Sequence, residues 1–278
     1  MKYKLLVTDL DGTLLDVSGQ VHERDRHAIA RLLKKGVPVA VCTGRMYSGT
    51  RDIARAVGVV GPVACVDGVH IVNTHDDKDL LLQTIAPRAA ETLFRVLTEH
   101  RPTTFVFSDD TLFHDETGAP YLSYVQTWSR RAQRLVDAVA HFGTSDSPVA
   151  GLVSLGTEEQ IHGTYASLLA EAGETLQCAT FSLRRPGFEG LWGMVVRAAG
   201  VSKATALEWI ARHYGIDPSE VVAVGDWLND IPMLARAGRS FAMAQAPDQV
   251  KEAATDQLEA DAITGGGIAE AAERSGLL

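Results

Sequence analysis

Two carboxylates, Asp9 and Asp11, stand one residue apart near the start of the chain, directly after a short apolar run. The run predicts a buried parallel strand, and Gly12 lets the backbone turn without a Cβ clash. In an open α/β sheet, chemistry collects at the carboxyl ends of strands. Asp9 and Asp11 are expected at such an end, close enough together to share a divalent cation.

Two other interpretations of this stretch need weighing. An EF-hand loop also begins with Asp-x-Asp, but its sixth position, normally Gly, would be Leu14, and its twelfth, normally Glu, would be Gln20. The EF-hand is therefore excluded. A strand followed by an ordinary Asp-Gly turn remains open from this stretch alone, so residues elsewhere in the chain must decide.

A second apolar run ends at Thr43, Gly44 and Arg45. A hydroxyl and backbone N–H groups beside a glycine, at a junction from strand to helix, can hold a phosphoryl oxygen. A plain helix cap by the Thr43 hydroxyl is the alternative. Both interpretations place Thr43 at the carboxyl end of a strand.

Two later segments carry further charged residues. Lys203 stands in the first turn of a predicted helix, where the helix dipole favours anions, so a nearby anion would explain it better than solvent alone. A β-branched run then ends at Gly225, followed by Asp226, Asn229 and Asp230. These side chains offer the oxygen ligands that Mg²⁺ prefers, although acidic helix capping is the alternative.

The strand ends should meet in space. Parallel strands joined by right-handed crossovers place their carboxyl ends on one edge of the sheet. Several carboxylates at one edge repel each other unless a cation is present, and Mg²⁺ would both resolve that repulsion and attract a phosphate. The residues expected to converge are Asp9, Asp11, Thr43, Lys203, Asp226, Asn229 and Asp230.

The segments D-x-D-G-T, T-G-R and G-D-x-x-N-D, with the lysine between the last two, resemble the motifs of the haloacid dehalogenase superfamily. The resemblance implies that Asp9 is the nucleophile and Asp11 the general acid and base. It implies that the phosphoryl group is bound by Thr43, Gly44, Lys203 and Asn229. It also implies a Mg²⁺ ion held by Asp9, Asp11, Asp226 and Asp230.

The same resemblance implies an α/β fold, with a Rossmann-like parallel-sheet core and an inserted α+β cap. The linker after Asp11 is too short for a cap there. Mixed helices and strands without another acidic strand end instead fill residues 85–190. We therefore expect a core of residues 1–84 and 191–278 and a cap of residues 85–190. This arrangement resembles the Cof-like branch with a type-two cap.

Three positions depart from the motifs of these relatives. Asp67 begins an Asp-Gly-Val segment where Asn-Gly-Ala is frequent, and we interpret it as a hairpin turn without a catalytic role. Trp227 stands where small residues are usual. Ala244-Gln245-Ala246 replaces Gly-Asn-Ala, which leaves the details near the site open.

Composition limits the partners of the protein. The net charge is −9 without a dense basic run, which argues against nucleic acid or an anionic membrane as the main partner. No apolar segment approaches the roughly 18 residues that span a bilayer. Cys42 and Cys65 lie in apolar runs and are expected as buried thiols. We expect a cytoplasmic protein that is a monomer or a small homo-oligomer.

Together these features predict a Mg²⁺-dependent phosphatase that hydrolyses a small phosphorylated metabolite, a sugar or polyol phosphate, through an aspartyl phosphate. A phosphomutase on the same scaffold and a catalytically silent ligand-binding protein are the alternatives. The core motifs recognise only phosphate and metal, so the cap is expected to contact the leaving group. Arg184, Arg185 and His114 are candidates for that contact.

Overall fold

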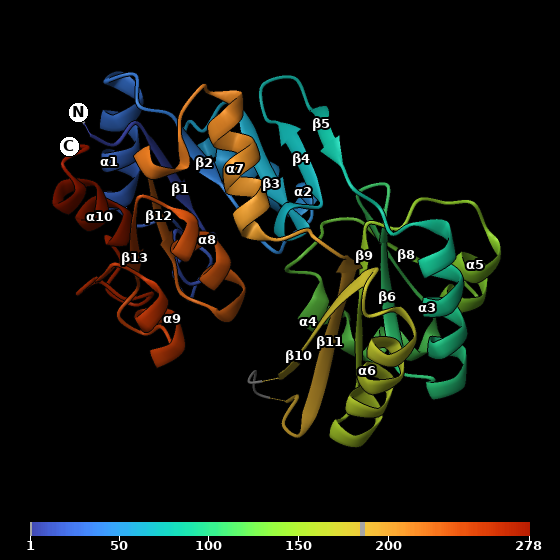
Figure 1. Cartoon of the computed structure of the whole chain (residues 1–278). Helices are drawn as coiled ribbons and strands as arrows, with labels where there is room; N and C mark the ends of the chain where they lie inside the picture. The colour runs from blue at the N-terminus through green and yellow to red at the C-terminus, as the bar shows by residue number, and fades with distance from the viewer. Residues whose placement is uncertain (1, 184–186) are drawn as a thin grey trace. The chain divides into compact units, whose positions relative to one another are not determined.

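The computed structural model describes residues 2–183 and 187–278, and the chain forms two compact units (Figure 1). The core unit comprises Met1–Gly44, Thr50–Leu81 and Ser202–Leu278. The inserted unit comprises Arg45–Gly49 and Leu82–Val201.

A five-stranded parallel sheet forms the centre of the core unit. In sheet order its strands are β14 (Asp256–Gln257), β13 (Arg239–Ala242), β12 (Val221–Gly225), β1 (Leu5–Thr8) and β2 (Val39–Val41). All residues of β1, β2 and β12 are buried, as their continuous apolar sequences predict. Since β1 lies between β12 and β2, residues that follow β1 lie between the ends of those two strands.

Helices cover this sheet and supply the rest of its apolar core. Leu207 and Ile210 of α7 pack in one buried cluster with Leu5, Val7 and Ala223 of the sheet. The spacing of the apolar residues in α7 follows the 3.6-residue period that brings one helix face to the core. The helices are α1 (Glu23–Lys34), α2 (Tyr47–Ala56), α7 (Lys203–His213), α8 (Ile231–Arg236), α9 (Asp248–Ala253) and α10 (Gly267–Ser275).

A smaller sheet extends the core unit beyond β2. Its strands, in order, are β3 (Pro62–Cys65), β4 (His70–Asn73) and β5 (Lys78–Leu82). Cys42 pairs with Ala64 in an isolated parallel bridge, which aligns the end of β2 with β3. The antiparallel pairing of β3 and β4 confirms the hairpin predicted at Asp67 and Gly68.

The inserted unit is built on a six-stranded mixed sheet. In order its strands are β10 (Leu176–Ser182), β11 (Leu191–Ala198), β9 (Gly151–Thr157), β6 (Thr103–Ser108), β7 (Thr111–His114) and β8 (Ala132–Arg134). Only the β7–β8 pair of the described strands in this sheet is parallel. Its helices are α3 (Pro87–His100), α4 (Leu122–Val125), α5 (Ala138–Thr144) and α6 (Glu158–Ala172).

The second junction between the units differs from the sequence expectation. The core was expected to resume at residue 191, where the structure has the strand Leu191–Ala198. This strand, β11, however, pairs with β10 and β9 in the sheet of the inserted unit. The core unit resumes only at Ser202. An apolar strand pattern indicates burial but does not show which strands will be the partners. The pattern therefore could not show that β11 belongs to the sheet of the inserted unit.

The predicted fold class is confirmed: a parallel α/β core interrupted by an α+β insertion. Cys42 and Cys65 are buried thiols, as expected. Among residues 2–183 and 187–278, no helix combines the length and apolar character that crossing a membrane requires.

Candidate active site

The register of the central sheet brings two acidic strand ends together. Thr8 pairs with Val224 of β12 and with Val41 of β2. The Asp9 backbone N–H then donates to the Val224 carbonyl at 2.9 Å. Asp9 therefore emerges beside Gly225 and Asp226, although more than two hundred residues separate them in sequence.

Asp230 is held in place by the segment that follows β12. Its Oδ2 accepts hydrogen bonds from the backbone N–H groups of Asp226 and Trp227, both at 2.9 Å. A Cβ at Gly225 would lie 2.6 Å from Asp230 Cγ, so only glycine allows this close approach. Asp226 is fixed separately, because the Thr13 hydroxyl donates to its Oδ1 at 2.7 Å.

Lys203 links the acidic residues. Its Nζ lies 2.5 Å from Asp9 Oδ1 and 2.6 Å from Asp230 Oδ1. Ser202 caps α7 through its side chain, which fixes Lys203 as the first helical residue. Lys203 was expected to face an anion, and these carboxylates are anions supplied by the chain itself. Only 1% of its side chain is exposed, so water does not screen these ion pairs.

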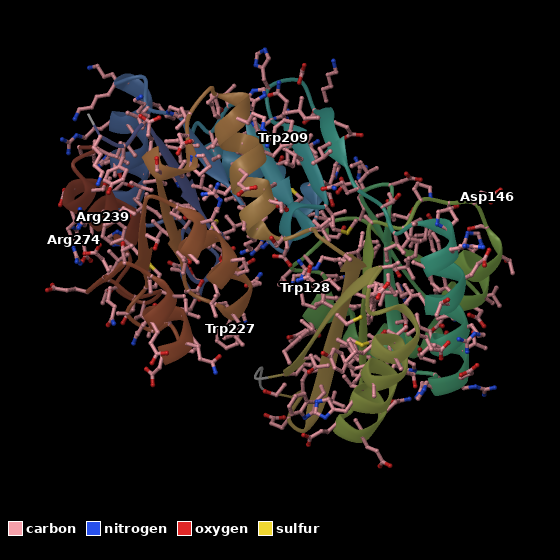
Figure 2. The ribbon with its side chains drawn as sticks, in the orientation of Figure 1. Trp128, Asp146, Trp209, Trp227, Arg239 and Arg274 are labelled. Carbon is pink, nitrogen blue, oxygen red and sulfur yellow. The ribbon has the colours of Figure 1, made fainter. Side chains whose placement is uncertain are left out.

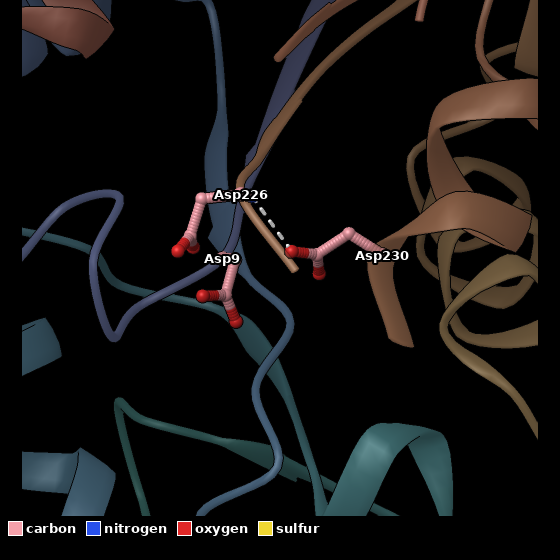
Figure 3. Close-up of side chains that lie close together, drawn as sticks. All are labelled: Asp9, Asp226 and Asp230. Atoms are coloured by element: carbon pink, nitrogen blue, oxygen red, sulfur yellow. Dashed lines mark hydrogen bonds between the residues drawn. The ribbon is translucent and has the colours of Figure 1, made fainter. Parts of the chain in front are cut away.

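Asp9, Asp226 and Asp230 form a compact buried group of carboxylates (Figure 3). One oxygen from each lies within 4.8 Å of the others. Figure 3 shows the three side chains turned toward one another from the ends of β1 and β12 and from the turn after β12. Asp11 is exposed and is not one of the three carboxylates in this group. Its predicted role as a metal ligand stays a prediction.

The electrostatics of the group favour a bound cation. Burial raises the pKa of Asp9 well above its ordinary value, and Lys203 only partly offsets that rise. Burial also raises the pKa of Asp226 to about 7, with Asp230 adding to the rise. Burial alone would lower the pKa of Lys203, but Asp230 and Asp9 outweigh it and raise that pKa well above its ordinary value. The positive charge of Lys203 thus compensates the negative charge of the buried carboxylates only in part.

The predicted phosphate-binding residues Thr43, Gly44 and Asn229 lie in one region of the core unit. A Cβ at Gly44 would come within 3.9 Å of Asn229 Nδ2 and 3.5 Å of Asp67 Oδ1. The Asn229 amide donates to Asp67 Oδ1 at 2.7 Å. The Asp67 backbone N–H donates to the Thr43 carbonyl at 2.9 Å. Lys203, 4.0 Å from Asp67, connects this region to the carboxylates.

Sequence reasoning missed the side-chain contacts of Asp67 and of Gln245. Asp67 was interpreted as a turn residue without a catalytic role, yet the residue is only 6% exposed and its side chain contacts Asn229. Gln245 Nε2 donates to the Gly12 carbonyl at 2.7 Å, and its Oε1 accepts from the Ala262 N–H at 3.1 Å. Both positions had been noted only as departures from a family motif, which was the one available signal.

The remaining positions that the sequence analysis singled out are Trp227 and three residues of the inserted unit. Trp227, which is labelled in Figure 2, is 37% exposed as a residue, and its backbone N–H donates to Asp230. His114 is buried within the inserted unit, beside the Phe105 ring. Arg184 and Arg185 lie outside the described residues.

Comparisons with known proteins identify the family of this chain. The family model of haloacid dehalogenase-like hydrolases matches residues 6–271. An HMP-PP phosphatase of Cronobacter sakazakii is 27% identical over 87% of this chain and 84% of its own length. The pyridoxal phosphate phosphatase YbhA of Escherichia coli is 27% identical over 90% of this chain and 91% of its own length.

A solved structure supports the fold over the whole chain. A haloacid dehalogenase-like hydrolase from Bacteroides thetaiotaomicron superposes with a TM-score of 0.81, at 22% identity, over 98% of this chain and 99% of the other. At that identity the likeness concerns the fold alone. The family match, the relatives and the acidic site at the strand ends lead to one conclusion. The chain belongs to the haloacid dehalogenase-like hydrolases, as a phosphatase of that family.

Proposed function

We propose that this protein is a Mg²⁺-dependent phosphatase that hydrolyses a small phosphate monoester, of the sugar or polyol phosphate class, through an aspartyl phosphate on Asp9. The observation that carries the proposal is the buried cluster of Asp9, Asp226, Asp230 and Lys203 at the carboxyl edge of the sheet. Pyridoxal phosphate, for which one relative is named, is likewise a small phosphate monoester.

The donor set fits Mg²⁺. Hard divalent cations prefer carboxylate oxygens, and the three carboxylates of Asp9, Asp226 and Asp230 present such oxygens within a short distance of one another. Burial and the neighbouring carboxylates raise the pKa values of Asp9 and Asp226, so a cation that compensates their negative charge is favoured there. When bound, Mg²⁺ supplies positive charge and polarises a phosphoryl oxygen.

Asp9 acts as the nucleophile in the proposed mechanism. One of its carboxylate oxygens attacks phosphorus, and the bond between phosphorus and the leaving-group oxygen breaks. Lys203, on the same carboxylate, orients Asp9 and neutralises charge that develops on the phosphoryl oxygens. Thr43, Gly44 and Asn229 bind those oxygens, because phosphoryl transfer depends chiefly on positioning and charge compensation.

Asp11 acts as the general acid and base. It gives its proton to the departing alkoxide in the first step. In the second step the resulting carboxylate takes a proton from water, which attacks phosphorus and releases phosphate and free Asp9. An exposed side chain, two residues after the nucleophile, is accessible to both the leaving group and water.

A panel of phosphate esters tests this function. The purified protein should release inorganic phosphate from some of them with Mg²⁺ present, and lose that activity with a chelator. Asp9→Asn should remain folded by circular dichroism and release no phosphate, since an amide is a poor nucleophile. Transfer of the phosphoryl group within the substrate, without free phosphate, would instead indicate a mutase. Full activity in metal-free buffer, or in Asp9→Asn, would contradict the proposal.

A further inference from the structure

Asp67 adds a carboxylate to the region where the phosphoryl group is expected to bind. It lies in the short turn Val66–Gly68 after β3, with a positive φ of 53°. Aspartate and asparagine tolerate this left-handed conformation better than most other residues except glycine. The backbone conformation therefore allows several residue types here and does not itself explain an acidic one.

The cost of this carboxylate is electrostatic. A negative charge beside an anion site disfavours a bound phosphate, and Asp67 also lies 4.0 Å from the ammonium of Lys203, whose charge the phosphate needs. An asparagine at this position would fill the same space without that charge. The hydrogen bonding of the Asp67 side chain is therefore considered apart from its charge.

The Asp67 side chain forms a hydrogen bond with Asn229. The Asn229 amide nitrogen donates to Asp67 Oδ1 at 2.7 Å, a short bond to a charged acceptor. A carboxylate only accepts hydrogen bonds, so it determines which end of the Asn229 amide faces it. The nitrogen carries two hydrogens, and Asp67 engages one of them. The other N–H then has a defined direction relative to Gly44, whose Cβ position is 3.9 Å from this nitrogen.

We propose that Asp67 is a positioning residue for Asn229: it fixes the amide orientation so that the second N–H donates to the transferring phosphoryl group, at the expense of weaker anion binding. The inference rests on the proposed phosphatase function. Two properties of Asp67 should then have different effects. Its hydrogen-bond acceptor should support kcat, and its negative charge should raise KM.

Two substitutions separate these properties. Asp67→Asn keeps an acceptor oxygen and removes the charge, and asparagine tolerates the positive φ. Asp67→Gly removes acceptor and charge together without straining the backbone, which alanine would not achieve. Both should lower KM and the inhibition constant of inorganic phosphate. Only Asp67→Gly should lower kcat, by about tenfold to hundredfold, the cost of misplacing a group by roughly 1 Å.

A double-mutant cycle with Asn229→Ala tests whether Asp67 acts through Asn229. Once Asn229 is absent, Asp67→Gly should cause little further loss of kcat. The inference would be overturned if Asp67→Gly lowered kcat by the same factor in the wild type and in Asn229→Ala. It would also be overturned if Asp67→Gly and Asp67→Asn had the same kcat. A purely structural role would lower the melting temperature of Asp67→Gly and leave kcat unchanged.

A spectroscopic measurement is independent of activity. The side-chain amide signals of Asn229, identified in an NMR spectrum by their loss in Asn229→Ala, should shift strongly in Asp67→Gly and much less in Asp67→Asn. Equal, small shifts in both variants would contradict the inference. If the wild type released no phosphate from any ester, the proposed function would fail, yet these spectra would still report whether Asp67 orients Asn229.

Discussion

The ammonium of Lys203 lies 2.5 Å from Asp9 Oδ1, across a sequence separation of 194 residues. Lys203 begins α7 and Asp9 follows β1, so this contact joins the first strand of the core unit to the segment that returns from the insertion. The same ammonium reaches Asp230 at 2.6 Å. Lys203 therefore connects three segments that are distant in sequence: the residue after β1, the turn after β12 and the start of α7.

Lys203→Met should destabilise the metal-free protein. Methionine fills similar space but leaves Asp9 and Asp230 buried without their counter-charge, and loss of one partner from a buried pair typically costs about 3–5 kcal/mol. The free energy of unfolding, measured with urea in the presence of a chelator, should fall by about that amount. Lys78→Met, at an exposed position on β5, is the matched control and should change little. Equal stability of the two variants would show that Lys203 does not neutralise the buried carboxylates.

Asp11→Asn should affect esters according to their leaving group. An amide cannot donate the proton that an alkoxide needs, whereas p-nitrophenolate leaves without one. With an alkyl phosphate such as glycerol phosphate the rate of formation of the aspartyl phosphate should fall by about 10²–10⁴, the usual range for general acid catalysis. With p-nitrophenyl phosphate that step should be almost unchanged, as rapid-quench measurements can determine. Similar losses for the two esters would argue against Asp11 as the acid.

The sequence predicts the acidic strand ends better than the contacts around them. Asp9 and Asp226 follow continuous apolar runs, and the topology rule for parallel sheets suffices to bring them together. The contact of Asp67 could not be predicted in this way. Asp-Gly is a strong local turn signal, but the hydrogen-bond partner of Asp67, Asn229, is 162 residues away. The hydrogen bond between Gln245 and Gly12, which are 233 residues apart, could not be predicted from local patterns either. Such side-chain pairs depend on tertiary packing, which local patterns do not encode.

Stability of the metal-free protein should depend on pH through Asp226. Burial raises the pKa of this carboxyl to about 7, whereas in the unfolded chain it keeps its ordinary value near 3.8. The folded protein therefore binds a proton that the unfolded chain releases, so the stabilisation is complete at low pH and is lost as pH rises through about 7. With a chelator present, this contribution should make the melting temperature higher at pH 6 than at pH 8.

Mg²⁺ should reverse this trend, since metal binding requires the deprotonated carboxylate and therefore stabilises the protein more at pH 8. Asp226→Asn is the control, because it removes the titrating group. The difference in melting temperature between pH 6 and pH 8 should shrink in this variant when the metal is absent. A variant with the same pH dependence as the wild type would rule out Asp226 as the responsible group.

Gly12→Ala should weaken metal binding, because the glycine leaves room for Asp226. Gly12 has a φ of +81°, and a Cβ there would lie 2.6 Å from Asp226 Oδ2, closer than real contacts allow. The carboxylate would have to move away from its hydrogen bond with Thr13. Gly19 is a matched control: its φ is +76°, and nothing lies within 4 Å of its Cβ position.

Both glycine variants should lose about 1–2 kcal/mol of stability from the left-handed backbone alone. Only Gly12→Ala should also raise the Mg²⁺ concentration that half-saturates activity, by about tenfold to hundredfold, the usual effect of disturbing the support of a metal ligand. Titration of activity with Mg²⁺, combined with urea unfolding of each variant, separates the two effects. If both variants had the same Mg²⁺ requirement, the loss in Gly12→Ala would be backbone strain alone, and the close packing of Gly12 against Asp226 would have no part in metal binding.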